Sequence, residues 1–144
     1  MKRQLLFALF SIGLITVSVL LALFSWLPDP LLSNPGWLPE RVGRWADHPD
    51  NINLRTALPM VAWGLLAGWI LYFKDLKICW WILSGLAGAL LVGIAELGQI
   101  WIPNRHPDWV DLAWGCLGLF AGMLLVRVFG WCLPGLKTTL MKAR

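Results

Sequence analysis

The sequence predicts an all-α membrane protein, a single four-helix bundle that takes up residues 1–144. The composition is 58% hydrophobic and only 14% charged, whereas charged residues make up about a quarter of a soluble domain. A helix needs roughly 20 apolar residues to cross a bilayer. Apolar runs of about this length occur at residues 4–26, 56–73, 78–102 and 109–133.

The first run, residues 4–26, follows Lys2 and Arg3. A secretory signal peptide has an apolar core of about 7–15 residues and a cleavage site made of small residues. This run is longer, and it ends in Leu-Phe-Ser-Trp-Leu-Pro, which lacks such a site. We therefore expect an uncleaved first membrane helix.

Residues 27–55 form the longest polar segment and are expected to be a Pro-rich loop on the outer side of the membrane. A short helix over residues 39–46 would suit Trp45, because tryptophan favours the headgroup level. The segment either only connects two membrane helices or covers the polar end of the bundle as a lid. Prolines prevent one continuous helix, and they lie at positions 28, 30, 35, 39 and 49.

The second run, residues 56–73, has Pro59 in its first turn, where the missing amide hydrogen of a proline costs least. Gly64 and Gly68 form a Gly-x-x-x-Gly pair, a spacing that often marks close contact between membrane helices. The pair indicates a packing surface on this helix. A charged turn at residues 74–77 leads to the third run.

Lys and Arg are unevenly distributed over the predicted loops, and this bias sets the orientation of a membrane protein. Most lie in the N-terminus, the 74–77 turn and the C-terminal tail, whereas the other side carries Arg41, Arg44, Arg55 and Arg105. We therefore expect both termini in the cytoplasm and the Pro-rich loop outside the bacterial inner membrane. A net charge of +4 in such flanks does not indicate a nucleic-acid partner.

The sequence does not indicate a metal or another cofactor. Cys79, Cys116 and Cys132 form no Cys-x-x-Cys pair, and His48 and His106 are the only histidines. Structural zinc needs about four such ligands at close spacing. We therefore expect neither a metal site nor a disulfide framework.

Polar residues gather where the third and fourth runs meet, within the segment 96–122. Charged side chains in membrane helices are costly and by default indicate a functional site. Small residues let membrane helices approach closely, so we expect the two runs to pack as an antiparallel hairpin. Helical spacing puts Gly85, Ala89, Gly93, Glu96 and Gln99 on one stripe, and Asp108, Asp111, Gly115, Gly118 and Gly122 on the other.

The hairpin would bring Glu96 and Gln99 towards Asp111, with Arg105 in the connecting break. An isolated buried carboxylate is unstable, so Glu96 is expected to be protonated or to be held by Arg105 or Gln99. Arg105 is suited to a carboxylate or a phosphate, because its guanidinium can donate two parallel hydrogen bonds. Three interpretations stay open: a structural clasp of Glu96, Arg105 and Asp111, a ligand site built on that clasp, and a catalytic site with Glu96 or Asp111 as acid or base.

These residues resemble the VanZ-like family of small bacterial membrane proteins. That family carries Glu-x-x-Gln, an Arg six residues later, acidic residues three and six after the Arg, and two glycines beyond them. The matching positions here are Glu96, Gln99, Arg105, Asp108, Asp111, Gly118 and Gly122. The family usually has Asn where this chain has Gly115, and Asp-Lys and His-Phe pairs near the second run, where this chain has Asn-Ile-Asn-Leu-Arg.

The resemblance implies a protein of the bacterial cell envelope. The family is linked with low-level resistance to the glycopeptide teicoplanin, and relatives accompany cell-surface and exopolysaccharide systems. We expect a non-enzymatic protein that binds a lipid-linked saccharide, an anionic lipid or a glycopeptide in an outward-facing pocket. The alternatives are an enzyme of surface polysaccharide metabolism and a structural subunit of a membrane complex. The expected binding residues are Glu96, Gln99, Arg105, Asp108 and Asp111.

Overall fold

The computed structural model describes residues 2–29, 31–33, 39–103 and 105–132, which contain helices and no strand. Within these ranges the long helices are α1 (Lys2–Ser25), α3 (Ile52–Phe73), α4 (Ile78–Gly98) and α5 (Trp109–Cys132). The short elements are α2 (Glu40–Ala46) and two 3₁₀ turns, η1 (Pro49–Asn51) and η2 (Gln99–Trp101). Each of the long helices is long and apolar enough to cross a membrane, which confirms the predicted four-helix membrane bundle.

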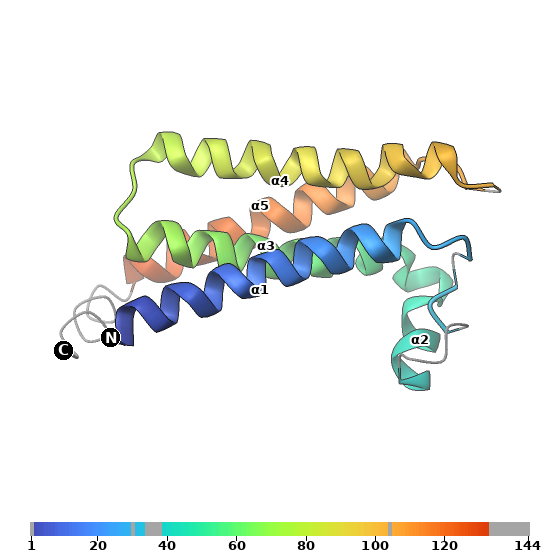
Figure 1. Cartoon of the computed structure of the whole chain (residues 1–144), viewed down its shortest axis with the longest axis horizontal. Helices are drawn as coiled ribbons and strands as arrows, with labels where there is room; N and C mark the ends of the chain where they lie inside the picture. The colour runs from blue at the N-terminus through green and yellow to red at the C-terminus, as the bar shows by residue number, and fades with distance from the viewer. Residues whose placement is uncertain (1, 30, 34–38, 104, 133–144) are drawn as a thin grey trace.

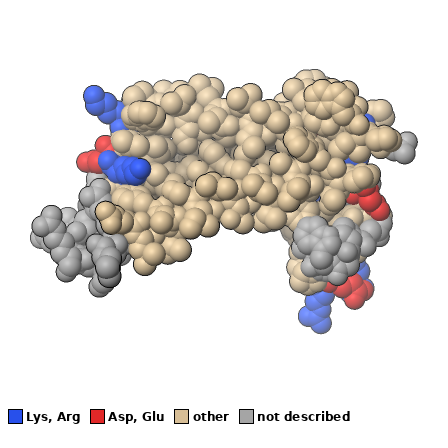
Figure 2. Space-filling model, viewed as in Figure 1, with Lys and Arg blue, Asp and Glu red and all other residues tan. Residues whose placement is uncertain are grey.

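The long helices run along the long axis of the molecule (Figure 1). The start of α1, the turn between α3 and α4 and the end of α5 lie at one end. The end of α1, the start of α5 and the short helix α2 lie at the other, which we call the α2 end (Figure 1). On the face that Figure 2 shows, charged side chains gather at these two ends and leave a belt without charged side chains between them. A bundle that crosses a membrane requires this distribution, because the hydrocarbon core excludes charge.

Two helix boundaries differ by four residues from the prediction, and those of α1 differ by one or two. α3 begins at Ile52, directly after η1, so Pro59 lies inside the helix and not in its first turn. The polar residues before the apolar run belong to the helix, but hydropathy identifies only the apolar part. α4 ends at Gly98 and passes into the 3₁₀ turn that holds Gln99. Residue 133, the predicted end of the fourth membrane helix, lies outside the described residues.

The small residues of α5 pack mainly on α3, and not on α4 as predicted. A Cβ atom added at Gly118 would lie 2.3 Å from the Ala57 carbonyl oxygen of α3. One added at Gly64 would lie 2.2 Å from the Leu119 carbonyl oxygen of α5. Gly122 approaches α3 in the same way. The two backbones touch because both helices carry glycine at the contact. The glycines of α4 do not lie against the α5 backbone in this way.

Of the glycines predicted to join α4 to α5, Gly115 lies at that contact and Gly93 does not. A Cβ atom at Gly115 would lie 2.7 Å from the Val92 side chain of α4, whereas nothing lies within 4 Å of one at Gly93. Gly88 instead faces the core, where an added Cβ atom would lie 2.8 Å from Leu119. The prediction for Gly93 was wrong because α4 is apolar on every side, so its pattern does not mark the buried face.

The core lies between α3, α4 and α5, and its fully buried side chains are Met60, Val92, Leu119 and Val126. α1 lies outside it, since none of its described side chains is buried. α1 packs along α3, and hydrogen bonds attach it to α3 and α4: Trp63 Nε1 donates to Ser18 Oγ at 3.0 Å, and Ser25 Oγ donates to the Ala95 carbonyl at 2.9 Å. Space remains beside α1 at the α2 end.

Candidate functional site

A cavity of about 340 Å³ occupies this space. α1, α3 and α4 form its walls, which are mostly apolar, and α2 covers it. Its polar side chains are Ser25, Arg55, Thr56, Glu96, Gln99, Arg105 and Asp111. The cavity thus brings together Glu96, Gln99, Arg105 and Asp111 among the predicted binding residues, and Asp108 does not line it.

Glu96 and Gln99 form the buried floor, with exposed fractions of 6% and 5%. Gln99 Nε2 donates to Glu96 Oε2 at 3.0 Å and to Ser25 Oγ at 3.1 Å. The Asp108 backbone N–H donates to the same Glu96 oxygen at 3.3 Å. Glu96 is therefore held by Gln99, one of the two partners predicted for it, and Gln99 connects α1 to the end of α4.

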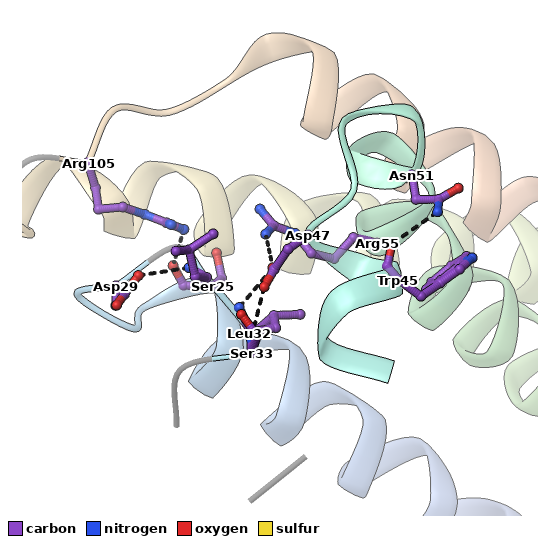
Figure 3. Close-up of polar contacts among 10 residues, drawn as sticks. Ser25, Asp29, Leu32, Ser33, Trp45, Asp47, Asn51, Arg55 and Arg105 are labelled. Carbon is purple, nitrogen blue, oxygen red and sulfur yellow. Dashed lines mark hydrogen bonds and ion pairs between the residues drawn. The ribbon is translucent and has the colours of Figure 1, made fainter. Parts of the chain in front are cut away.

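Arg105 does not form the predicted ionic clasp. Among the described residues it makes no ion pair with Glu96 or Asp111, and its Nη2 donates to the Ser25 carbonyl at 3.2 Å (Figure 3). The last carbonyl groups of a helix lack partners within it, so the end of α1 attracts the guanidinium that the prediction gave to the carboxylates. Arg105 Nε is buried, and the part of the chain that the structure describes offers it no hydrogen-bond acceptor.

The charge of Arg105 is destabilised by its surroundings. Burial lowers the pKa of its guanidinium, and the nearby Arg55 guanidinium lowers it further, although Glu96 and Asp111 oppose this change. An arginine stays charged even so, because its ordinary pKa is far above neutrality. Arg55 and Arg105 therefore place two positive charges within electrostatic range of each other at the polar end of the cavity.

The two predicted aspartates have different positions. Asp108 is exposed, and its Oδ1 accepts a hydrogen bond from the Val110 N–H at 2.7 Å. Such a bond caps the first turn of a helix, so Asp108 has a local role at the start of α5, and its binding role stays a prediction. Asp111, in the first turn of α5, lines the cavity and has Thr56 of α3 as a hydrogen-bonding neighbour.

α2 covers the cavity through Val42, Trp45 and Ala46, which supports a lid and not a mere connection. Asp47, directly after α2, fixes the lid. The Leu32 and Ser33 backbone N–H groups each donate to its carboxylate at 2.9 Å. Arg55 Nη1 lies 3.7 Å from Asp47 Oδ1 (Figure 3). The Asp47 side chain is only 10% exposed, so the lid contact is largely shielded from water.

Sequence reasoning did not select Ser25, Thr56, Asp47 or Arg55 for the site. The spacing of Arg55 was the clearest available signal. Arg55 lies four residues before Pro59, so the two residues share one face if the helix extends to Arg55. Once the helix begins at Ile52, that face points to the cavity. Ser25 lies near the end of an apolar run, Asp47 lies inside the polar segment and Thr56 directly follows it, and no spacing marked any of the three.

Comparison with known proteins does not indicate a function, so an assignment must rest on the geometry of the site. No protein-family model, curated protein or solved structure matches this chain. The cavity combines guanidinium groups at one end with apolar walls along its length. This combination suits an amphipathic molecule with a polar or anionic head.

We expect the lid to loosen at acid pH. Burial alone would raise the pKa of Asp47, but hydrogen bonds from Ser33 and Leu32 and the charge of Arg55 outweigh it and lower the pKa below its ordinary value of 3.8. The stabilisation that Asp47 gives is therefore complete above about pH 4 and is lost as pH falls through the lowered pKa. Hydrogen-exchange protection at the Leu32 and Ser33 amides should fall over that range.

The Asp47→Asn variant serves as the control for this prediction. It should show low protection of both amides already at neutral pH, and its protection should change little on acidification. Equal protection in the wild type and in Asp47→Asn at neutral pH would show that Asp47 does not hold the lid.

Proposed function

We propose that this chain is a VanZ-like, multi-pass protein of the bacterial inner membrane that binds an amphipathic ligand in the cavity at the α2 end. The ligand carries an anionic or sugar-bearing head, as lipid-linked saccharides, anionic lipids and glycopeptides do. The observation that carries the proposal is the division of the cavity into a polar end with Arg55 and Arg105 and apolar walls from α1 and α3. Ligand sites are commonly concave and apolar with a few polar groups that fix orientation.

The hydrogen bonds at the floor favour binding over catalysis. A general acid or base must reach the proton that it transfers. Glu96 Oε2 instead accepts hydrogen bonds from Gln99 and from the Asp108 amide. These contacts fix the carboxylate in the wall of the cavity, where it orients its neighbours. Arg105, with a donor that lacks an acceptor, is the residue best placed to contact a ligand.

The envelope setting rests on the resemblance of the segment 96–122 to the VanZ-like family and on the distribution of Lys and Arg. That distribution favours cytoplasmic termini and an α2 end that faces outward. The cavity would then open towards the outer leaflet, where surface glycolipids and glycopeptide antibiotics are found.

The test is ligand capture by purified protein. We expect native mass spectrometry to detect bound amphiphiles after incubation with a bacterial lipid extract or with teicoplanin. Arg105→Ala should weaken this binding about tenfold to a hundredfold, since a hydrogen bond to a charged group contributes about 1.5–3 kcal/mol. The matched control is Arg41→Ala, which removes an exposed arginine of α2 that does not line the cavity.

Thermal unfolding of both variants in detergent separates lost binding from lost folding. A folded Arg105→Ala protein that binds every amphiphile as the wild type does would contradict the proposal.

A further inference from the structure

We propose that the ligand is a phosphate-bearing lipid, which enters the cavity from the membrane between α1 and α3 and places its phosphate between Arg55 and Arg105. This inference rests on the proposed function and specifies the class of ligand, its route of entry and a second contact residue. Three groups of observations support it: the hydrogen-bond partners at the polar end, the exposure of the cavity walls, and the contact between Asp47 and Arg55.

The polar end has one buried donor that lacks an acceptor, although acidic side chains are near. This donor is Arg105 Nε, for which the described residues supply no acceptor. Glu96, Asp47 and Asp29 each accept at least one hydrogen bond from an uncharged N–H group, so these carboxylates already have partners. A phosphate supplies several acceptor oxygens together with negative charge, and arginine binds it through paired hydrogen bonds. It would satisfy Arg105 and relieve the repulsion between Arg105 and Arg55.

Side chains of the cavity lining on both α1 and α3 are partly exposed on the surface. Leu20 of α1 and Leu54 and Leu58 of α3 line the cavity while keeping exposed fractions of 41%, 38% and 48%. The wall formed by α4 is closed, because Val92 and Ala95 are only 1% and 3% exposed. In a membrane, side chains that are exposed between the two charged ends of the bundle contact acyl chains. A ligand that already lies in the bilayer can therefore enter without crossing water.

The apolar part of the cavity has the length of the first part of an acyl chain. Its lining reaches Val17, which lies about two helical turns, or roughly 12 Å, from Ser25 along α1. A lipid can then keep its phosphate at the polar end while its chain lies along α1. A soluble saccharide would leave these walls in contact with water, which is unfavourable.

Arg55 can change partners without leaving Asp47 unsatisfied. The Asp47 carboxylate lies 3.7 Å from Arg55 Nη1 but receives shorter hydrogen bonds, at 2.9 Å, from the Leu32 and Ser33 amides. When the Arg55 guanidinium binds a phosphate in place of Asp47, the Asp47 carboxylate keeps its hydrogen bonds from the Leu32 and Ser33 amides. The lid therefore stays attached while the lipid is bound.

The experiment uses the whole protein in detergent micelles and three probes that divide the lipid into parts. Dioleoylphosphatidic acid has both phosphate and chains, dioleoylglycerol has the same chains without phosphate, and glycerol 3-phosphate has the phosphate without chains. We expect the two partial probes to bind at least about tenfold more weakly than the complete lipid, because each lacks one class of contact. Equal binding of dioleoylglycerol and dioleoylphosphatidic acid would overturn the role of the phosphate. Equal binding of glycerol 3-phosphate would overturn the role of the lipid.

Arg55→Gln should weaken binding of dioleoylphosphatidic acid about tenfold or more. It should leave the binding of dioleoylglycerol unchanged. Arg44→Gln is the matched control, because Arg44 carries the same charge at the same end of the bundle but is 68% exposed and pairs with Glu40. Arg55→Lys keeps the charge without the paired hydrogen bonds and should give an intermediate loss. A variant series that binds the phosphatidic acid as tightly as the wild type would contradict the assignment of Arg55.

The route of entry is tested separately with Leu58→Trp, which fills the opening between α1 and α3. It should slow association of dioleoylphosphatidic acid from vesicles, whereas Leu124→Trp, on a lipid-facing position of α5 outside the cavity, should not. Equal association rates would overturn lateral entry.

The outcomes also separate this inference from the proposed function. If teicoplanin binds in an Arg105-dependent way and phosphatidic acid does not, the proposed function stands and the inference fails. If none of these amphiphiles binds, both fail.

Discussion

Replacing Gly118 by alanine should destabilise the bundle by about 3 kcal/mol or more, near or above the upper end of the usual cost of overpacking. The added methyl group would lie 2.3 Å from the Ala57 carbonyl oxygen, a distance that no pair of such atoms tolerates. The obstacle is backbone and not a flexible side chain, so α3 and α5 must move apart. Unfolding titrations in mixed micelles measure the change in free energy.

The matched control is the same substitution at Gly93, where an added Cβ atom meets nothing within 4 Å. Gly93→Ala should be neutral or stabilise the protein by about 0.5–1 kcal/mol, because alanine loses less backbone entropy than glycine in a helix. Effects of equal size at the two positions would show that the close contact between α3 and α5 does not determine stability.

Gln99→Leu should give the second large loss, about 1–3 kcal/mol. Leucine fills similar space, but it removes the donor that Glu96 Oε2 and Ser25 Oγ both share. Of its two donors among the described residues, Glu96 Oε2 would keep only the Asp108 amide, and a buried acceptor that loses its partner keeps its desolvation cost. The end of α1 should also detach more readily, which faster hydrogen exchange in the last turn of α1 would report.

Gln4→Leu is the control for this change, since Gln4 is exposed at the opposite end of α1. Surface substitutions of this kind usually change stability by less than about 0.5 kcal/mol. A comparable loss in Gln4→Leu would mean that the amide bonds of Gln99 are not the cause.

Hydropathy was sufficient to predict the membrane helices, because the length of an apolar run is fixed by the thickness of the bilayer. Helical spacing was also sufficient to place Glu96, Gln99 and Asp111 at one end of two neighbouring helices, where the cavity lies. Both inferences need only local geometry along one segment.

What the sequence could not supply was the choice of partners between segments. Gly118 could have packed on either neighbour, since α3 and α4 are both largely apolar, and this composition does not reveal the close fit of Gly64 to the α5 backbone. Arg105 was assigned to carboxylates close in sequence, but the carbonyl that it contacts belongs to Ser25, far away along the chain. Asp47 and Arg55 meet because η1 and the first turn of α3 are helical, which their polar composition did not predict.

The attachment of α1 depends on distant parts of the chain. The groups that bind it by hydrogen bonds, Trp63, the Ala95 carbonyl and Gln99, all follow α1 in the sequence. These contacts can form only after the later segments have entered the bilayer, and until then α1 must remain in the lipid without them.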